Sequence, residues 1–93
     1  RNYQCRRGEI DLVMLDGTAL VFVEVRYRRS NRYGSGADSV TFTKQRRIVS
    51  AARQFLGRHA QHARRPCRFD VVSIGRGGDG VELDWIQNAF EAS

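Results

Sequence analysis

The chain has 93 residues, of which 16 are Lys or Arg and 10 are Asp or Glu, so its formal net charge is +6 at pH 7. This length fits one domain with a modest core, and no apolar run approaches the roughly 20 residues that cross a membrane. Arginine supplies the positive charge almost alone, since Lys44 is the only lysine. Because the planar guanidinium suits phosphate oxygens, we expect a polyanionic partner. The absence of a long apolar run predicts no membrane association, and the absence of a secretory leader predicts a cytoplasmic location.

The first third of the chain predicts a β-hairpin. Residues 1–7 carry few helix signals and no methionine, so we expect a domain that is truncated at its N-terminus. Two β-rich runs, 9–15 and 18–27, then flank an Asp-Gly dipeptide, which is a strong hairpin signal in such a context. Within the second run, residues 20–25 are apolar on both faces apart from Glu24, as in a central strand that is covered on both sides.

A loop and a helix are expected next. Residues 28–38 are polar, basic and contain glycine, which is typical of a loop. From 43 to 59, apolar side chains recur at steps of three and four residues, as on one face of a helix. Thr41 or Thr43 can cap the start of this helix.

The last third predicts two more strands. They cover 68–74 and 81–86, with a glycine-rich turn between them and residues 88–90 as a tail. The strand before the helix and the strand after it can be parallel, joined by a right-handed crossover.

The hairpin register predicts a cluster of carboxylates. If the Asp-Gly pair is the two-residue loop, Glu9 lies opposite Glu24, and Asp11 lies diagonally across from Glu24. Residues directly opposite share a face and each strand alternates faces, so these three acids project from the same side, together with Arg26. Direct neighbours would be about 4.5–5.5 Å apart and diagonal ones about 7–8 Å.

Two interpretations of this cluster stay open. Like charges that face each other destabilise a sheet, and a divalent cation held by carboxylates and water would remove the repulsion, which suits Mg²⁺ or Mn²⁺. Alternatively, Arg7 and Arg26 neutralise Glu9 and Glu24 as cross-strand ion pairs. The apolar neighbours of Glu24 and the basic charge of the chain favour the metal.

Gln45 adds a weaker signal near the start of the predicted helix. It falls within the apolar stripe of the helix, unlike its two neighbours in sequence. Its amide either caps the helix locally, which is the simpler interpretation, or points at the carboxylates or at a phosphate.

Several segments together resemble one protein family. The runs RNYQCRRGEIDLVMLDG, LVFVEVRYRRS, SVTFTKQRRI and RFDVVSI, with the closing NAF, resemble the YraN-like family of small uncharacterised bacterial proteins over essentially the whole chain. The resemblance implies one nuclease-like domain over residues 1–93, with a restriction-endonuclease-like α/β fold, similar to that of Holliday-junction resolvases. Its mixed sheet would have the order β-β-β-α-β-β. The family's N-terminal helix, which precedes the RNY strand, is missing here, and the sheet face left uncovered would favour a partner or a homodimer.

The resemblance also implies a metal site of the PD-(D/E)XK type. Asp11 matches the first acidic position, and Glu24 with Arg26 matches the E-x-K element. Glu9 is an extra carboxylate of the family's G-E-I-D motif, and Gln45 matches its K-Q pair. The lysine position is thus occupied by Arg26, which stays charged and can only stabilise the developing charge of the phosphorane.

The expected function is cleavage of DNA phosphodiesters, including branched or structured DNA, by an endonuclease that depends on Mg²⁺ or Mn²⁺. Asp11, Glu24 and Glu9 would hold the metal, with the carbonyl of Val25. Six basic residues would contact the nucleic-acid backbone, which we expect to be DNA more than RNA: Arg28, Arg29, Arg32, Lys44, Arg46 and Arg47. Two alternatives stay open, namely a catalytically inactive nucleic-acid-binding protein on the same fold and an assembly protein that docks a partner.

Overall fold

The computed structural model describes residues 10–27, 40–77 and 80–92. Their elements are four strands, one α-helix and a short 3₁₀ helix: β1 (Leu12–Asp16), β2 (Ala19–Tyr27), α1 (Phe42–Arg58), η2 (Ala60–His62), β3 (Cys67–Gly77) and β4 (Gly80–Phe90). The strands form one sheet in the order β1-β2-β3-β4, in which β2 and β3 are parallel and the other neighbours are antiparallel. The mixed α/β sheet and the parallel strands on either side of the helix are therefore confirmed.

The predicted order of elements is confirmed in part. The described residues have the order β-β-α-β-β, and the family's RNY strand, at the start of the chain, lies outside them. The predicted loop at 28–38 also lies outside them. Within the described ranges, no helix combines the length and the apolarity that a membrane span requires.

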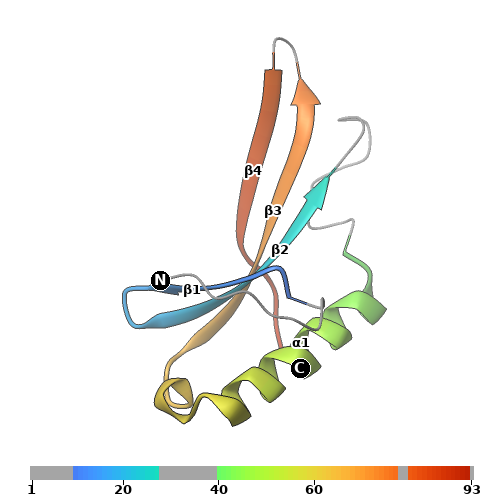
Figure 1. Cartoon of the computed structure of the whole chain (residues 1–93). Coiled ribbons are helices and arrows are strands. Elements are labelled where there is room, and N and C mark those ends of the chain that lie inside the picture. The colour runs from blue at the N-terminus through green and yellow to red at the C-terminus, as the bar shows by residue number, and fades with distance from the viewer. Residues whose placement is uncertain (1–9, 28–39, 78–79, 93) are drawn as a thin grey trace.

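α1 covers one face of the sheet, while β3 and β4 run side by side as a long ribbon that extends beyond it (Figure 1). The ring of Phe22 in β2 lies edge-on to Phe55 of α1, with 5.8 Å between centroids, and stacks on Phe69 of β3 at 5.5 Å. The opposite face carries a smaller buried cluster: Val21, Val23 and Val72. β2 is therefore buried on both faces, as its apolar sequence predicted.

The start of α1 lies one residue before the predicted one. Thr41 has extended backbone angles, and its Oγ1 accepts a hydrogen bond from the backbone N–H of Lys44 at 3.1 Å. Thr41 is therefore the N-cap, and it satisfies one of the donors that the first turn leaves without an intrahelical partner.

The predicted hairpin register is wrong by two residues. Asp16 pairs with Ala19, so the loop consists of Gly17 and Thr18 instead of the Asp-Gly pair. Gly17 has a φ of +60°, and glycine with positive φ at the first loop position is the pattern of a type II′ turn. A shift of two residues keeps each side chain on its predicted face, but it changes which residues lie directly opposite.

The predicted C-terminal tail is also wrong, because β4 continues through residues 88–90. Phe90 pairs with Phe69 of β3 beyond an irregularity in the register, and their rings stack at 5.1 Å. Asn88 lies at this irregularity with a φ of +53°, and its N–H donates to Oδ1 of Asp70 at 2.9 Å. The carboxylate of Asp70 thus holds a bulge that lets the strand continue.

Candidate functional site

Two acidic side chains meet where β1 begins beside β2. Leu12 pairs with Val23, and the same register continued by one residue places Asp11 across from Glu24. Oδ2 of Asp11 accepts the backbone N–H of Val25 at 2.8 Å, and its carboxyl group lies close enough to that of Glu24 to raise the pKa of Glu24. The two acids predicted to be diagonal neighbours are therefore direct neighbours.

The surroundings of Glu24 oppose its negative charge. The residue is 4% exposed. This burial, followed by the neighbouring carboxyl group of Asp11, raises the pKa of Glu24 to about 7, although Lys44 and Arg26 act in the opposite direction. Near neutral pH the carboxyl group of Glu24 is therefore protonated for much of the time, which is one way to relieve repulsion between adjacent carboxylates.

Two cations approach one oxygen of Glu24 from different elements. Nη1 of Arg26, on the same strand, and Nζ of Lys44, in the first turn of α1, each lie 3.8 Å from Oε2 of Glu24. These distances exceed those of a hydrogen bond, so both ion pairs are loose. Arg26 thus partly neutralises Glu24 from the same strand, whereas the predicted cross-strand pairs involve Arg7 and Glu9, which lie outside the described residues.

The predicted metal ligands are placed in part. Asp11 and Glu24 come together, while Glu9 lies outside the described residues. Within residues 10–27, 40–77 and 80–92, no group of three or more His, Cys, Asp or Glu side chains could hold a metal ion. The described part of the acidic centre is the pair of Asp11 and Glu24.

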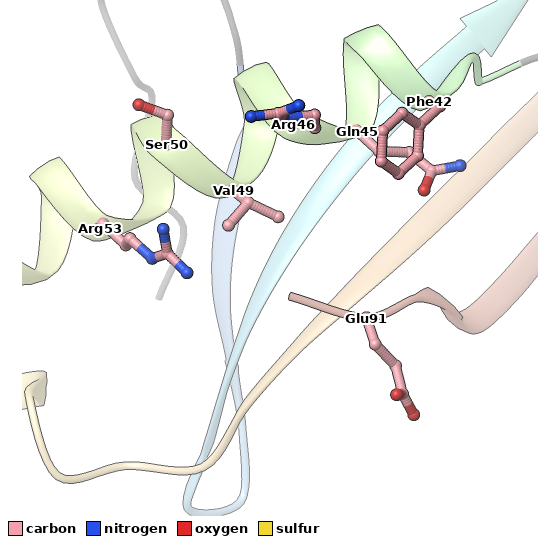
Figure 2. A pocket seen from close by; sticks show the side chains of 7 residues that line it. All are labelled: Phe42, Gln45, Arg46, Val49, Ser50, Arg53 and Glu91. Atoms are coloured by element: carbon pink, nitrogen blue, oxygen red, sulfur yellow. The ribbon is translucent and has the colours of Figure 1, made fainter. Parts of the chain in front are cut away.

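Gln45 takes the local role. Its Nε2 donates to the backbone carbonyl of Val40 at 3.0 Å, so it stabilises the start of α1. It also lines a pocket of about 280 Å³ on one flank of the helix: Phe42, Gln45, Arg46, Val49, Ser50, Arg53 and Glu91 (Figure 2). The guanidinium of Arg46 lies 5.9 Å from the centre of the Phe42 ring.

The six predicted backbone-contacting residues divide into three groups. Arg46 and Arg47 are exposed on α1, where a nucleic-acid backbone could reach them. Lys44 instead lies at the acidic pair, which the sequence did not predict. The other three lie outside the described residues: Arg28, Arg29 and Arg32.

A second buried carboxylate, missed in the sequence, lies on the opposite face of the sheet. Asp70 is fully buried and accepts hydrogen bonds from Nε of Arg68, Nε1 of Trp85 and the N–H of Asn88. Burial alone would raise its pKa, but these donors outweigh burial and lower the pKa of Asp70. Arg68 also binds Asp16 at 2.9 Å. Since its charge is fully satisfied, Asp70 has a structural role.

Comparison with known proteins gives one consistent result. Residues 1–74 match the model of the uncharacterised protein family UPF0102. The chain is 53% identical over 92 residues to a UPF0102 protein of Stutzerimonas stutzeri, with 99% of this chain and 77% of that protein aligned. A UPF0102 protein of Pseudomonas savastanoi is 50% identical over 93 residues, with 99% of this chain and 76% of that protein aligned. A UPF0102 protein of Pseudomonas aeruginosa is 51% identical over 94 residues, with 99% of this chain and 75% of that protein aligned.

Proposed function

The chain belongs to the uncharacterised protein family UPF0102, and we propose that it is an endonuclease that cleaves DNA phosphodiesters in the cytoplasm, on a restriction-endonuclease-like fold. Branched or structured DNA is the proposed substrate, and Mg²⁺ or Mn²⁺ the proposed cofactor. The observation that carries the proposal is the direct contact of Asp11 with the buried Glu24 beside two cations. Paired carboxylates for a metal and cations for a phosphate are the groups that phosphodiester hydrolysis uses.

The acidic pair fits a hard divalent cation. Mg²⁺ is commonly held by one or two carboxylates, with water completing its shell, so Asp11 and Glu24 suffice, and Glu9 is proposed as a third ligand. The pKa of Glu24 is raised to about 7 although Lys44 and Arg26 both act to lower it. A bound cation would displace the proton of this pair, and it would supply Lewis-acid activation of the scissile phosphate and of the attacking water.

The protein's own cations would bind and orient the substrate. The side chain of Arg26 is more exposed than that of Glu24, so its planar guanidinium would bind non-bridging oxygens of the scissile phosphate and stabilise the charge that develops there. Arg46 and Arg47, exposed on α1, would contact the backbone away from the reacting phosphate. Asp11, fixed by the N–H of Val25, would hold its carboxylate in one orientation.

Two other functions each have an observation in their favour. Arginine in the lysine position favours a protein that binds nucleic acid without cleaving it. Exposed apolar side chains on β4 favour a protein that docks a partner: Val81, Leu83 and Trp85. The last of these pairs with Val72 of the cluster opposite α1, so this sheet face is where a partner or a second copy would bind.

Cleavage of a panel of labelled DNAs separates the three functions. With linear, flapped and four-way-junction DNA, we expect Mg²⁺- or Mn²⁺-dependent cleavage that Asp11→Asn and Glu24→Gln abolish. Asp16→Asn is the matched control, because it removes an exposed carboxylate at the far end of β1, the strand that Asp11 precedes. Salt-sensitive binding without cleavage would select the binding protein, and oligomerisation with little affinity for DNA would select the docking protein. Cleavage that survives both substitutions would come from a contaminant and would overturn the proposal.

A further inference from the structure

We propose that Lys44 is a catalytic residue of this site and that it binds the scissile phosphate from α1, in place of a lysine at the strand position that Arg26 occupies. The inference rests on the proposed function and deepens it. It differs from the expectation that Lys44 contacts the DNA backbone at a distance from the reaction.

The placement of Lys44 is the first observation. Its Nζ lies 3.8 Å from Oε2 of Glu24, as near as the guanidinium of Arg26. The two cations belong to different elements, β2 and α1, so they bracket one carboxylate oxygen from two sides. Lys44 is also the only lysine among 16 basic residues, and it is the one that lies at the acidic pair.

The helix itself gives no reason for a cation at this position. Lys44 is the third residue of α1, and its N–H binds the capping Thr41. After a threonine cap, Glu or Gln is favoured at this position, because its side chain can return to the N–H of the cap. The helix dipole also disfavours positive charge in the first turn. A lysine that opposes both local preferences is explained by what it faces, namely the acidic pair.

An ammonium group adds something that the neighbouring arginine lacks. It is a compact charge with three donors on a flexible stem, and the side chain of Lys44 is 27% exposed, so substrate can reach it. Arg46 and Arg47, the next basic residues of α1, are exposed and are suited to contacts with the DNA backbone instead. Lys44 can therefore bind both a non-bridging oxygen of the phosphate and the attacking water, while Arg26 binds a second oxygen.

The reaction served is hydrolysis, and its balance needs no further reactant. The oxygen of one water forms a bond to phosphorus, and the bond from phosphorus to one sugar oxygen breaks. The proton lost by the water goes to solvent, and the departing sugar oxygen takes a proton from solvent. Lys44 exchanges no proton in this reaction, and its role is to stabilise the added negative charge of the phosphorane.

The test compares Lys44→Met with Arg58→Met, which removes an exposed positive charge from the last turn of the same helix. For the DNA that the unmodified protein cleaves, single-turnover rates are measured at saturating protein. We expect Lys44→Met to lower the rate at least 100-fold, in line with the loss of one preorganised donor, and Arg58→Met to lower it less than threefold. Affinity for DNA in EDTA should change less than threefold in both variants.

Two further measurements do not depend on the rate of Lys44→Met alone. Mn²⁺ affinity without DNA, followed by electron paramagnetic resonance, should rise or stay equal in Lys44→Met, because a cation beside Glu24 has been removed. The double variant Lys44→Met/Arg26→Lys should cleave at least tenfold faster than Lys44→Met alone, because it returns an ammonium group to the neighbourhood of the Glu24 carboxylate. If Lys44→Met unfolds, Lys44→Arg takes its place. This variant keeps the ion pair, and we expect it to fold and to lose at least tenfold in rate.

Each failure has a distinct signature. If the unmodified protein cleaves and Lys44→Met cleaves at the same rate, the role of Lys44 is overturned and the nuclease stands. If the rate falls only in proportion to DNA affinity, Lys44 is a backbone contact. If Lys44→Arg is fully active where Lys44→Met unfolds, Lys44 is a structural ion-pair partner. If the unmodified protein shows no metal-dependent cleavage, both proposals fall.

Discussion

The carboxyl group of Asp11, which accepts the backbone N–H of Val25 at 2.8 Å, lies close enough to Glu24 to affect its pKa. Burial, together with Asp11, raises the pKa of Glu24 to about 7. The protein therefore holds the exposed Asp11 beside the buried Glu24, and this burial costs folding free energy when Glu24 is ionised. This arrangement is the basis of the proposed cation site.

Glu24 should make the metal-free protein less stable as the pH rises. Below its unfolded value of 4.5, Glu24 is protonated in both states, and its contribution to stability is fully present. Above about pH 7 it is ionised in both states, and the folded state bears a penalty of about 3 kcal/mol, since one pKa unit corresponds to ~1.4 kcal/mol. The stability contributed by its raised pKa is thus lost between pH 4.5 and 7.

Urea unfolding in EDTA at pH 5 and pH 8 checks this window. Glu24→Gln mimics the protonated carboxyl group, so its free energy of unfolding should fall less over the same range. The difference in pH dependence between the unmodified protein and Glu24→Gln gives the contribution of Glu24 alone. Other acids, such as Asp70, whose pKa is lowered, contribute equally to both proteins. Equal pH dependence in both proteins would contradict the buried, protonated state of Glu24.

Metal binding should stabilise the protein and release protons. Because a cation binds the ionised carboxylates, Mn²⁺ should displace the proton of Glu24 at pH 6.5, and it should raise the melting temperature as its concentration exceeds Kd. Calorimetric titration in two buffers of different ionisation enthalpy counts the protons released. Asp16→Asn should behave like the unmodified protein, whereas an unchanged response in Asp11→Asn would place the metal elsewhere.

Asp70 should be needed for stability. Asp70→Ala would leave Nε of Arg68, the indole N–H of Trp85 and the N–H of Asn88 without this acceptor in the described structure. Loss of one partner of a buried charge pair usually destabilises by about 3–5 kcal/mol. Asp16→Ala removes the exposed partner of the same arginine and should cost about 0–1 kcal/mol. Similar losses in the two variants, measured by urea unfolding, would refute the structural role of Asp70.

A pair of glycines tests the backbone conformation of the hairpin turn. Gly17 has a positive φ, and a Cβ added there would meet no other atom within 4 Å, so Gly17→Ala should destabilise by roughly 1–2 kcal/mol through backbone strain alone. Gly57 has equal space but lies within α1, and Gly57→Ala should stabilise by roughly 0.5–1 kcal/mol. Thermal unfolding of both variants gives the two signs, and a neutral Gly17→Ala would contradict the type II′ turn.

Much of the fold could be predicted because its signals are local. The apolar stripe of α1, the doubly apolar β2 and the Asp-Gly turn are each contained in a short stretch of sequence. The register could not be predicted, because an Asp-Gly sequence fits a loop of residues 16 and 17 as well as a loop of residues 17 and 18. Only the pairing of Asp16 with Ala19 distinguishes the two placements. The two-residue error kept the faces, and the acidic pair was predicted on the correct side for that reason.

The remaining features depend on distant contacts. Lys44 reaches Glu24 only because α1 packs across β2, and the packing of a helix on a sheet is not encoded in the periodicity of either. The extension of β4 depends on Asp70, which is 18 residues away from Asn88. The one local sign of the role of Lys44 was a lysine three residues after a threonine cap, where an acid is favoured.

The most direct test of the metal site is an anomalous difference map from crystals grown with Mn²⁺. We predict a peak within coordination distance of the carboxylates of both Asp11 and Glu24, and no such peak in crystals of Asp11→Asn grown in the same way. A map from crystals saturated with Mn²⁺ that shows no density between Asp11 and Glu24 would contradict the central claim, namely that this pair is the metal site of a nuclease.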